Sequence, residues 1–471
     1  MAQLSSDPVA IEPAVISEDA ERRSLSAFLR NPPRILLTRS VTVVGATLLL
    51  GAIFKLSAFG REAFITSRFG LSSVTDAYFA LQQLPVTVAA YMLGPFARAF
   101  TPAYAESYKK DGRVEWLGGL VFYGVLIALA LTLISFAFSS QILTLLTRSD
   151  SWPTLATLSI CYLPILFIGF RAATWTSFGR NLRSLTVAGL PYLVMTLVLI
   201  GMYFAHEMGN LSLALSMSAG FVCVGLASLA GVFWTEKPLQ NSEHFLRPWK
   251  FPAFRKFTSQ LTASSAETIG SFTNQFMMLY FMARAGTGAI SANNCATRIG
   301  MLGYSLFAQP LLQLLQARLC SSTKGDEQKI ARRYTASLAV GASIFAIGIF
   351  LFRYPLVALV YKRGNFTGSE LEAVIAILPA WLCYFVVLSL ITIISQYMFH
   401  QSLGYKFTRN MLAGYTGTNI LRFATAHSMG AAWIIWCAVI SEGTAFLANC
   451  LTSVTSAGWS PFRRPVVCEE A

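Results

Sequence analysis

The sequence contains little charge for its length. Only 12% of its 471 residues are Asp, Glu, Lys or Arg, whereas a soluble domain carries about 25%. Hydrophobic residues make up 55% of the chain. This balance excludes a water-soluble globular protein and indicates a chain that crosses a membrane many times. The formal net charge of +14 comes from Lys and Arg spread over short loops, so it does not indicate nucleic-acid binding.

Residues that hold metals or cofactors are also scarce. The four histidines lie far apart, none of the eight cysteines forms a CxxC pair, and most cysteines fall in apolar stretches. No GxxxxGK[ST] string is present. We therefore expect no metal site, no disulfide framework and no cofactor. Paired catalytic acids are missing as well, so the sequence does not predict an enzyme.

The chain lacks a polar loop long enough to fold as a soluble domain, which argues against a polymerase or glycosyltransferase. A spanning helix needs roughly 20 apolar residues, and about twelve stretches qualify. They centre on 41–59, 74–104, 116–139, 154–178, 185–206, 211–234, 259–283, 289–317, 334–352, 369–398, 405–426 and 429–452. The predicted fold class is an all-α polytopic membrane protein, with two six-helix lobes around a central cavity.

Polar segments divide the chain. Residues 1–40 have no signal-peptide core and predict a disordered cytoplasmic tail. Residues 41–234 and 259–452 are the predicted lobes, joined by a cytoplasmic linker at 235–258 and followed by a cytoplasmic tail at 453–471. With both termini cytoplasmic, the inner loops hold about 24 Lys and Arg against about 8 outside. This bias sets the expected orientation.

A cluster of charges follows the first apolar stretch, Val41–Phe54. It contains Lys55, Arg61, Glu62 and Arg68, and Asp76 begins the next stretch. A charge at bilayer depth costs roughly 3 kcal/mol or more unless it is paired or faces water. The cluster therefore predicts a polar cavity between helices, and such a cavity suggests a solute that crosses the membrane.

Glycine and proline interrupt two of the predicted spans. Pro85, Gly94 and Pro95 lie in the second span, and Pro310 lies in the eighth. Such breaks are tolerated where neighbouring helices or water satisfy the freed carbonyl groups. A Phe-Gly or Ala-Gly turn precedes the second helix of each half, as expected for parallel repeats in a transporter.

Three stretches carry a resemblance to a known family. KLSAFGRE at 55–62 is followed by TDAYFA and FARAFTPAYAE, ISANNCATRIGMLGYSLFAQPLLQLL begins at residue 290, and VYKRGNFTGSELEAVIAILPAWLCYF begins at residue 360. In this order they resemble the MurJ/MviN family of lipid II flippases, which lies in the multidrug/oligosaccharidyl-lipid/polysaccharide exporter superfamily. The pattern departs from the family at Ala89 and Ala90, where an arginine pair is usual.

The resemblance implies alternating access around a cationic cavity. The expected function is translocation of a polyprenyl-pyrophosphate-linked saccharide, either lipid II or an exopolysaccharide repeat unit, across the bacterial inner membrane. The expected substrate-binding residues are Arg61, Arg298, Lys55, Asp76, Ser291 and Arg98. Two acids within spans, Glu267 and Glu442, are candidates for coupling to a cation or proton. Polar groups for reading the sugars are Gln82, Gln83, Asn274, Gln275, Asn293 and Asn294.

Two alternatives remain open at this point. One is an exporter of small drugs on a related bundle, but its cavity should be acidic, and the deep charges here are mostly basic. The other is a non-transporting scaffold of a cell-envelope synthesis complex. The expected partners are the lipid-linked glycan, membrane lipids and, as candidates, cell-envelope synthases.

Overall fold

The computed structural model describes residues 34–111, 114–146, 161–178, 180–205, 209–236, 247–304, 308, 311, 315, 326–401, 403–425 and 430–457. The chain divides into two compact units, Met1–Leu49 and Leu50–Ala471. The described residues of the first unit are the helical segment 34–49.

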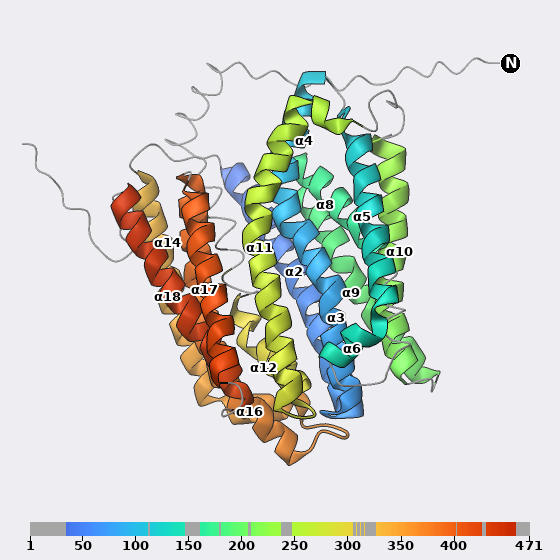
Figure 1. Ribbon diagram of the computed structural model, residues 1–471, viewed down its shortest axis with the longest axis vertical. Helices are drawn as coiled ribbons and strands as arrows, with labels where there is room; N and C mark the ends of the chain where they lie inside the picture. The colour runs from blue at the N-terminus through green and yellow to red at the C-terminus, as the bar shows by residue number, and fades with distance from the viewer. Residues whose placement is uncertain are drawn as a thin grey trace, which may run out of the picture. The chain divides into compact units, whose positions relative to one another are not determined.

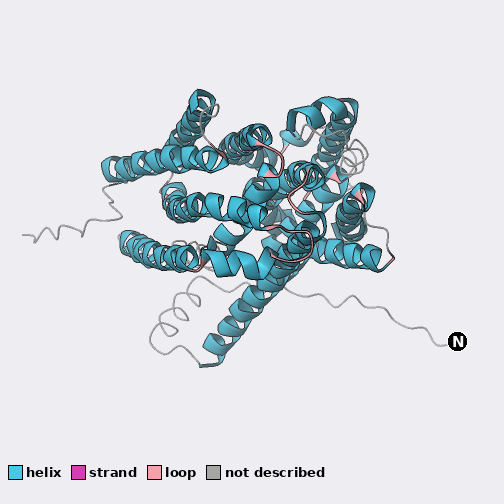
Figure 2. Cartoon of the chain, turned by 90° about the horizontal axis from the view of Figure 1, so that it is seen from below, coloured by secondary structure: helices cyan, strands magenta, loops and turns pink. Residues whose placement is uncertain are grey.

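Helices make up almost all of the described chain, and these residues contain no β-strand (Figure 2). The membrane-protein prediction of an all-α fold is thereby confirmed. The helices are α2 (Arg34–Phe69), α3 (Ser73–Tyr91), η1 (Met92–Phe96), α4 (Ala97–Asp111), α5 (Leu117–Ala137), α6 (Ser139–Leu146), α8 (Tyr162–Ser177), α9 (Asn181–Phe204), α10 (Asn210–Glu236), η3 (Pro248–Lys250), α11 (Pro252–Ala285), α12 (Ala289–Gly300), α14 (Asp326–Leu351), α15 (Arg353–Tyr361), α16 (Gly368–His400), α17 (Gly404–Thr425) and α18 (Ala431–Ala457).

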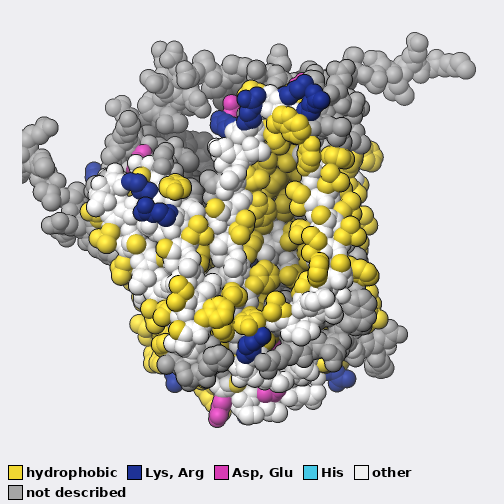
Figure 3. Space-filling model, in the orientation of Figure 1, with side chains coloured by type: hydrophobic (Ala, Val, Ile, Leu, Met, Phe, Trp, Pro, Cys, Tyr) yellow, Lys and Arg dark blue, Asp and Glu magenta, His cyan; other side chains and the backbone are white. Residues whose placement is uncertain are grey.

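Six of the described helices are long and apolar enough to cross a membrane by themselves. They cover Leu117–Ala137, Leu182–Phe204, Leu211–Trp234, Glu327–Leu351, Gly368–Met398 and Ala431–Ser456. Their outer faces carry exposed Leu, Ile and Phe side chains, and Figure 3 shows hydrophobic side chains over the flanks of the helices with Lys and Arg near the ends. A surface of this kind is suited to lipid and not to water.

Helices of the second unit associate in two groups that match chain order (Figure 1). α8 packs on α4, α5, α9 and α10, whereas α16 packs on α12, α14, α17 and α18. α11 and α12 contact α3, and α11 also contacts α4, so these helices join the groups.

The interruption expected in the second span is a turn of π-helix. η1 contains Gly94 and Pro95, and it lies between α3 and α4 without a break in the helix. A proline lacks an N–H group and its ring clashes with the carbonyl four residues earlier. The wider π turn relieves that clash, as is usual at such sites. Pro310 lies outside the described residues.

Two predicted boundaries differ from the observed helices. The described part of α2 starts at Arg34, although the tail was expected to continue to residue 40. α11 begins at Pro252, inside the predicted linker. Proline is well suited to a helix start because its missing N–H would have no partner there. Residues 1–33, 237–246 and 458–471 lie outside the described residues.

Three parts of the chain contact one another at one end of the second unit, namely the α2–α3 turn, the start of α12 and the α15–α16 loop. α2 ends at Gly70 (φ 63°), whose N–H donates to the Thr66 carbonyl at 2.8 Å. The loop after α15 contains Gly364 (φ 62°), and a Cβ there would lie 2.3 Å from the Ser67 carbonyl oxygen. Glycine is therefore required at Gly364 both by its backbone conformation and by this close approach.

Substitution of Gly364 by Ala should destabilise the protein by about 1–3 kcal/mol, because the new methyl group meets backbone and the residue has a positive φ. Thermal unfolding in detergent micelles measures the effect. Gly368→Ala is the matched control, since nothing lies within 4 Å of a Cβ there. Equal melting temperatures for the two variants would contradict this account of the loop.

Candidate functional site

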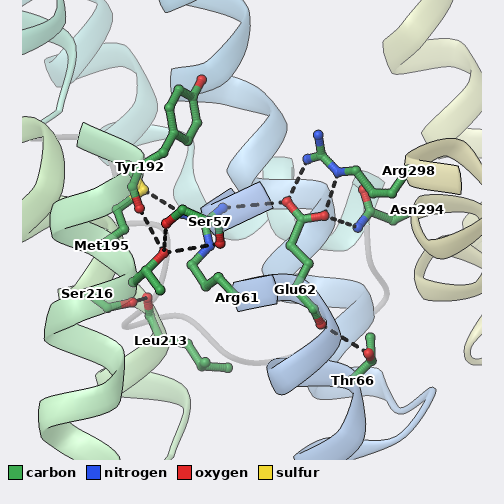
Figure 4. A network of polar contacts seen from close by, with 11 residues as sticks. Ser57, Arg61, Glu62, Thr66, Tyr192, Met195, Leu213, Ser216, Asn294 and Arg298 are labelled. Carbon is green, nitrogen blue, oxygen red and sulfur yellow. Dashed lines mark hydrogen bonds and ion pairs between the residues drawn. The ribbon is translucent and has the colours of Figure 1, made fainter. Parts of the chain in front are cut away.

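The charged residues of α2 form a cluster in which an acid, Glu62, is paired with arginines. Lys55 and Glu62 are seven residues apart, so they lie about 10 Å apart along one helix face. Figure 4 shows Glu62 with Arg61 on one side and Arg298 and Asn294 of α12 on the other. The acid that follows Arg61 in the sequence therefore forms the centre of the cluster.

Glu62 accepts hydrogen bonds from two side chains of α12. Arg298 donates from Nε to Oε2 at 2.5 Å and from Nη2 to Oε1 at 2.6 Å, and Asn294 Nδ2 donates to Oε2 at 3.1 Å. This bidentate pairing is the strongest geometry available to an arginine and a carboxylate. It links α2 to α12 of the second helix group, whereas Ser57 and Arg61 bond α2 to α9 of the first group.

The Glu62 carboxylate and the Arg298 guanidinium differ in how much of their surface is exposed. The Glu62 side chain is 2% exposed, whereas the Arg298 side chain keeps 37% of its surface exposed. The arginine is thus neutralised on one side and open on the other. A soluble anion that approaches this region meets Arg298 before it meets Glu62.

Arg61 lies behind Glu62 and is fully buried. Its Nη1 donates to the Met195 sulfur of α9 at 2.7 Å, and its Nη2 is 3.5 Å from Glu62 Oε1. Its Nε has no hydrogen-bond partner among the described residues. In this conformation Arg61 supports Glu62 from the first helix group and is not accessible to a ligand.

Lys55 is exposed and lies within electrostatic range of Arg298 and Glu62. It makes no ion pair at 4.0 Å or less with a described residue. Its flexible ammonium group adds positive charge to the surroundings of Arg298. Arg98, which was also expected in the site, belongs to α4, but its side chain lies outside the described residues.

Asp76 and Ser291 contact each other and not the arginines. Asp76, in the first turn of α3, accepts from the Gly288 N–H at 2.7 Å, the Ser291 N–H at 2.8 Å and the Ser291 hydroxyl at 2.6 Å. The carboxylate therefore caps the N-terminus of α12 from another helix, where a negative charge is favoured. Both residues are buried, and their polar groups are used in this cap.

The same end of the molecule is closed by further loop contacts. Asn365 donates from its backbone N–H to the Ser67 carbonyl at 2.8 Å and from Nδ2 to the Arg68 carbonyl at 2.7 Å. Glu370 Oε1 accepts from the Leu71 N–H at 2.5 Å. We refer to these contacts, together with the Asp76 cap, as the end latch. It joins the α2–α3 turn to α12 and to the α15–α16 loop.

A cavity of about 260 Å³ lies among α3, α11, α12, α16, α17 and α18. Five of the six polar residues expected to read sugars line it, namely Gln83, Asn274, Gln275, Asn293 and Asn294. Gln83 Nε2 also donates to Gln275 Oε1 at 2.8 Å, across α3 and α11. Gln82 is buried and is not part of the lining. Asn294 belongs both to this lining and to the Glu62–Arg298 cluster.

The two acids expected to couple transport to a cation lie deeper in the second helix group. Glu442 is buried and accepts from Asn274 Nδ2 at 2.9 Å and from the Tyr384 hydroxyl at 3.0 Å. Glu267 is partly exposed and contacts Tyr415. No group of three His, Cys, Asp or Glu residues suited to a metal ion occurs in the part of the chain that the structure describes.

Sequence reasoning missed two residues of the site. Glu62 was noticed as a charge but not as a partner of Arg298, because the two are 236 positions apart. Arg422 lines the cavity, although it was not among the expected site residues. The sequence did contain a signal for Arg422, because it lies inside an apolar stretch, and the same pattern led to the prediction of Arg298.

Comparisons with known proteins agree with this arrangement. The family model described as lipid II flippase MurJ matches residues 65–406. A probable lipid II flippase MurJ of Aquifex aeolicus is 26% identical over 350 residues, which cover 71% of this chain and 66% of that protein. Lipid II flippase MurJ of Burkholderia cenocepacia is 23% identical over 359 residues, which cover 71% and 67%. The chain thus spans about two thirds of the length of these relatives.

Solved structures show the same fold. Lipid II flippase MurJ in an inward closed conformation superimposes with a TM-score of 0.73 at 17% identity, covering 87% of each chain. An inward-facing multidrug resistance MATE family transporter of the MOP superfamily gives 0.69 at 12% identity, covering 88% of this chain and 97% of the other. With the match over residues 65–406, the chain belongs to the lipid II flippase MurJ family.

Proposed function

We propose that this protein is a flippase that moves a polyprenyl-pyrophosphate-linked saccharide across the bacterial inner membrane by alternating access. Lipid II is the first candidate, because the curated relatives bear the name lipid II flippase. An exopolysaccharide repeat unit is the second candidate. The proposal describes a transporter and not an enzyme, with the lipid-linked glycan as its partner and cell-envelope synthases as candidate neighbours.

One observation carries the proposal, namely an arginine that is both paired with an acid and accessible. Arg298 is held by Glu62 of the other helix group, and its side chain is 37% exposed. A diphosphate oxygen that replaces Glu62 exchanges one charge-assisted pair for another, so Arg298 is never left unpaired. Substrate binding would then weaken the link between α2 and α12, which is what a change of access requires.

The charge of the cluster suits a diphosphate. Lys55, Arg61 and Arg298 against the single carboxylate of Glu62 give a formal net charge of about +2. A diphosphate in this linkage carries about two negative charges, so the complex would be close to neutral. A small cationic drug would be repelled by the same cluster, which favours the flippase over the drug exporter.

The end latch supports alternating access. Its contacts are hydrogen bonds at helix ends and the loops that adjoin them, including Asn365 to Ser67 and Leu71 to Glu370, and they join segments from both helix groups. With both chain termini cytoplasmic, this end faces away from the cytoplasm, as the distribution of basic loops predicts. Opening toward that side would need these bonds to break while the helices stay intact.

The remaining parts of the proposal follow the sequence. Residues 41–234 and 259–452 act as two lobes that rock about the site, with 235–258 as the linker between them. Asp76 and Ser291 act through the end latch, and Arg98 contributes from α4. Glu267 and Glu442 are the coupling candidates. An inside-negative potential favours outward movement of an anion by about 2.3 kcal/mol per charge at 100 mV.

Loss of Arg298 should abolish flipping. Arg298→Ala removes the accessible cation, so in proteoliposomes the rate of translocation of a fluorescent lipid II analogue is expected to fall at least about tenfold, the effect of losing one charge-assisted contact. Rescue of a bacterium depleted of MurJ should fail at unchanged protein level. Lys256→Ala is the control, because Lys256 forms an exposed ion pair with Glu106 outside the site.

The same assays separate the alternatives. Flipping of an exopolysaccharide precursor without lipid II would identify that substrate, and altered drug susceptibility without either activity would indicate a drug exporter. Full rescue by the double substitution of Arg61→Ala and Arg298→Ala would remove the proposed role of the cluster.

Locking the end latch should stop transport reversibly. Ser67 and Asn365 have backbones joined by a 2.8 Å hydrogen bond, so paired cysteines at these positions are close enough for a disulfide. Oxidation of the Ser67→Cys, Asn365→Cys double variant should reduce flipping to background, and a reducing agent should restore it. Each single cysteine variant is the control. Parent-level flipping by the cross-linked protein would show that this end does not open.

A further inference from the structure

Arg422 is a buried arginine in the second helix group whose role the family resemblance does not supply. It is 1% exposed and belongs to α17. Its Nε donates to the Ile434 carbonyl at 3.0 Å, and its Nη1 donates to the Asn274 carbonyl at 3.0 Å and to Asn274 Oδ1 at 2.6 Å. All of these acceptors are uncharged, so none of them neutralises the guanidinium.

The nearest carboxylate reaches Arg422 only through an amide. Glu442 makes no ion pair with Arg422 within 4.0 Å among the described pairs. Instead Asn274 accepts from Arg422 with Oδ1 and donates to Glu442 with Nδ2 at 2.9 Å. The other Glu442 oxygen is taken by Tyr384. The arrangement leaves the positive charge of Arg422 only partly compensated, which is costly at this depth.

One nitrogen of Arg422 remains available. Nη2 makes no hydrogen bond to a described residue, and Arg422 lines the 260 Å³ cavity together with Asn274 and Tyr384. The cavity is slightly below the usual range of about 300–1,000 Å³ for a small-molecule site. It suits one sugar ring rather than a whole glycan, and its five side-chain amides offer both donors and acceptors to such a ring.

We propose that Arg422 is the anion-binding residue of this cavity and takes an oxyanion, a carboxylate or a phosphate, attached to the sugar next to the lipid. The inference rests on the proposed function and deepens it. A planar guanidinium held by four backbone and amide acceptors, the fourth being Asn419 Oδ1, presents its remaining nitrogen in a fixed direction, which suits an oxyanion. The site adjoins the Glu62–Arg298 pair through Asn294, but neither Glu62 nor Arg298 lines the cavity.

Matched soluble ligands test the proposal on the purified full chain in nanodiscs. N-acetylmuramic acid supplies a carboxylate, N-acetylglucosamine 1-phosphate supplies a phosphate, and N-acetylglucosamine is the neutral control. Ligand-detected NMR titration measures the weak affinities expected. Arg422→Gln should lower affinity for one or both anionic sugars at least about tenfold, as expected for a charged hydrogen bond, and leave the neutral sugar unchanged. The anionic sugar whose affinity falls shows whether Arg422 binds a carboxylate or a phosphate.

A second variant keeps the test decisive if Arg422→Gln fails to fold. Glu442→Gln preserves the shape and the bond from Asn274, and its Nε2 can donate to the Tyr384 hydroxyl oxygen in place of the bond that Glu442 accepts. The substitution removes the neighbouring negative charge, so affinity for the anionic sugar should rise about threefold or more. A purely structural Arg422–Glu442 pair predicts no such rise. Arg409→Gln, at an exposed arginine of the same helix, should change nothing. Unchanged anion affinity in Glu442→Gln would overturn the proposal.

Two further measurements separate this site from the proposed function. The affinity differences should persist in an Arg298→Gln background, because Arg298 lies outside the cavity lining. If they vanish there, the anion binds at Arg298 and the assignment to Arg422 is wrong. If the parent protein binds the anionic sugar through Arg422 but flips no lipid-linked glycan, the site remains and the flippase proposal fails.

Discussion

The structure depends on the high cost of leaving a charge unpaired at bilayer depth. Glu62 and Arg298 satisfy this constraint together, with two hydrogen bonds between them and a third from Asn294. Because the partners come from α2 and α12, the electrostatic requirement is also a mechanical link between the helix groups. In the function that we propose, an anionic headgroup takes the place of the carboxylate, and recognition is thereby coupled to movement.

The second helix group also contains a buried acid and a buried arginine. There the carboxylate of Glu442 and the guanidinium of Arg422 are joined through the Asn274 amide and do not touch directly. The cavity beside them is lined by five side-chain amides, three aromatic rings and several aliphatic side chains. The protein thus has one charge cluster between α2 and α12 and one partly polar cavity among α3, α11, α12, α16, α17 and α18.

Acids near the helix ends serve a different purpose. Asp76 stabilises the N-terminus of α12, and Glu370 holds the α2–α3 turn through the Leu71 N–H. Glycine at position 364 lets the loops approach closely enough for these bonds to form. Bonds of this type are short-range and lie at helix ends and in the adjoining loops, so they can break without disturbing the hydrophobic packing along the helices.

The sequence by itself determined the helical membrane class, six of the twelve expected spans and the family, because long apolar stretches and local motifs such as KLSAFGRE are properties of contiguous residues. It also selected Arg298 and five of the six amides expected to contact sugar. Only the tertiary structure decided which charges are neutralised. It paired Arg298 with Glu62, turned Asp76 toward Ser291 and placed Arg422 beside the cavity, since contacts across more than 100 positions depend on how helices pack and not on local sequence.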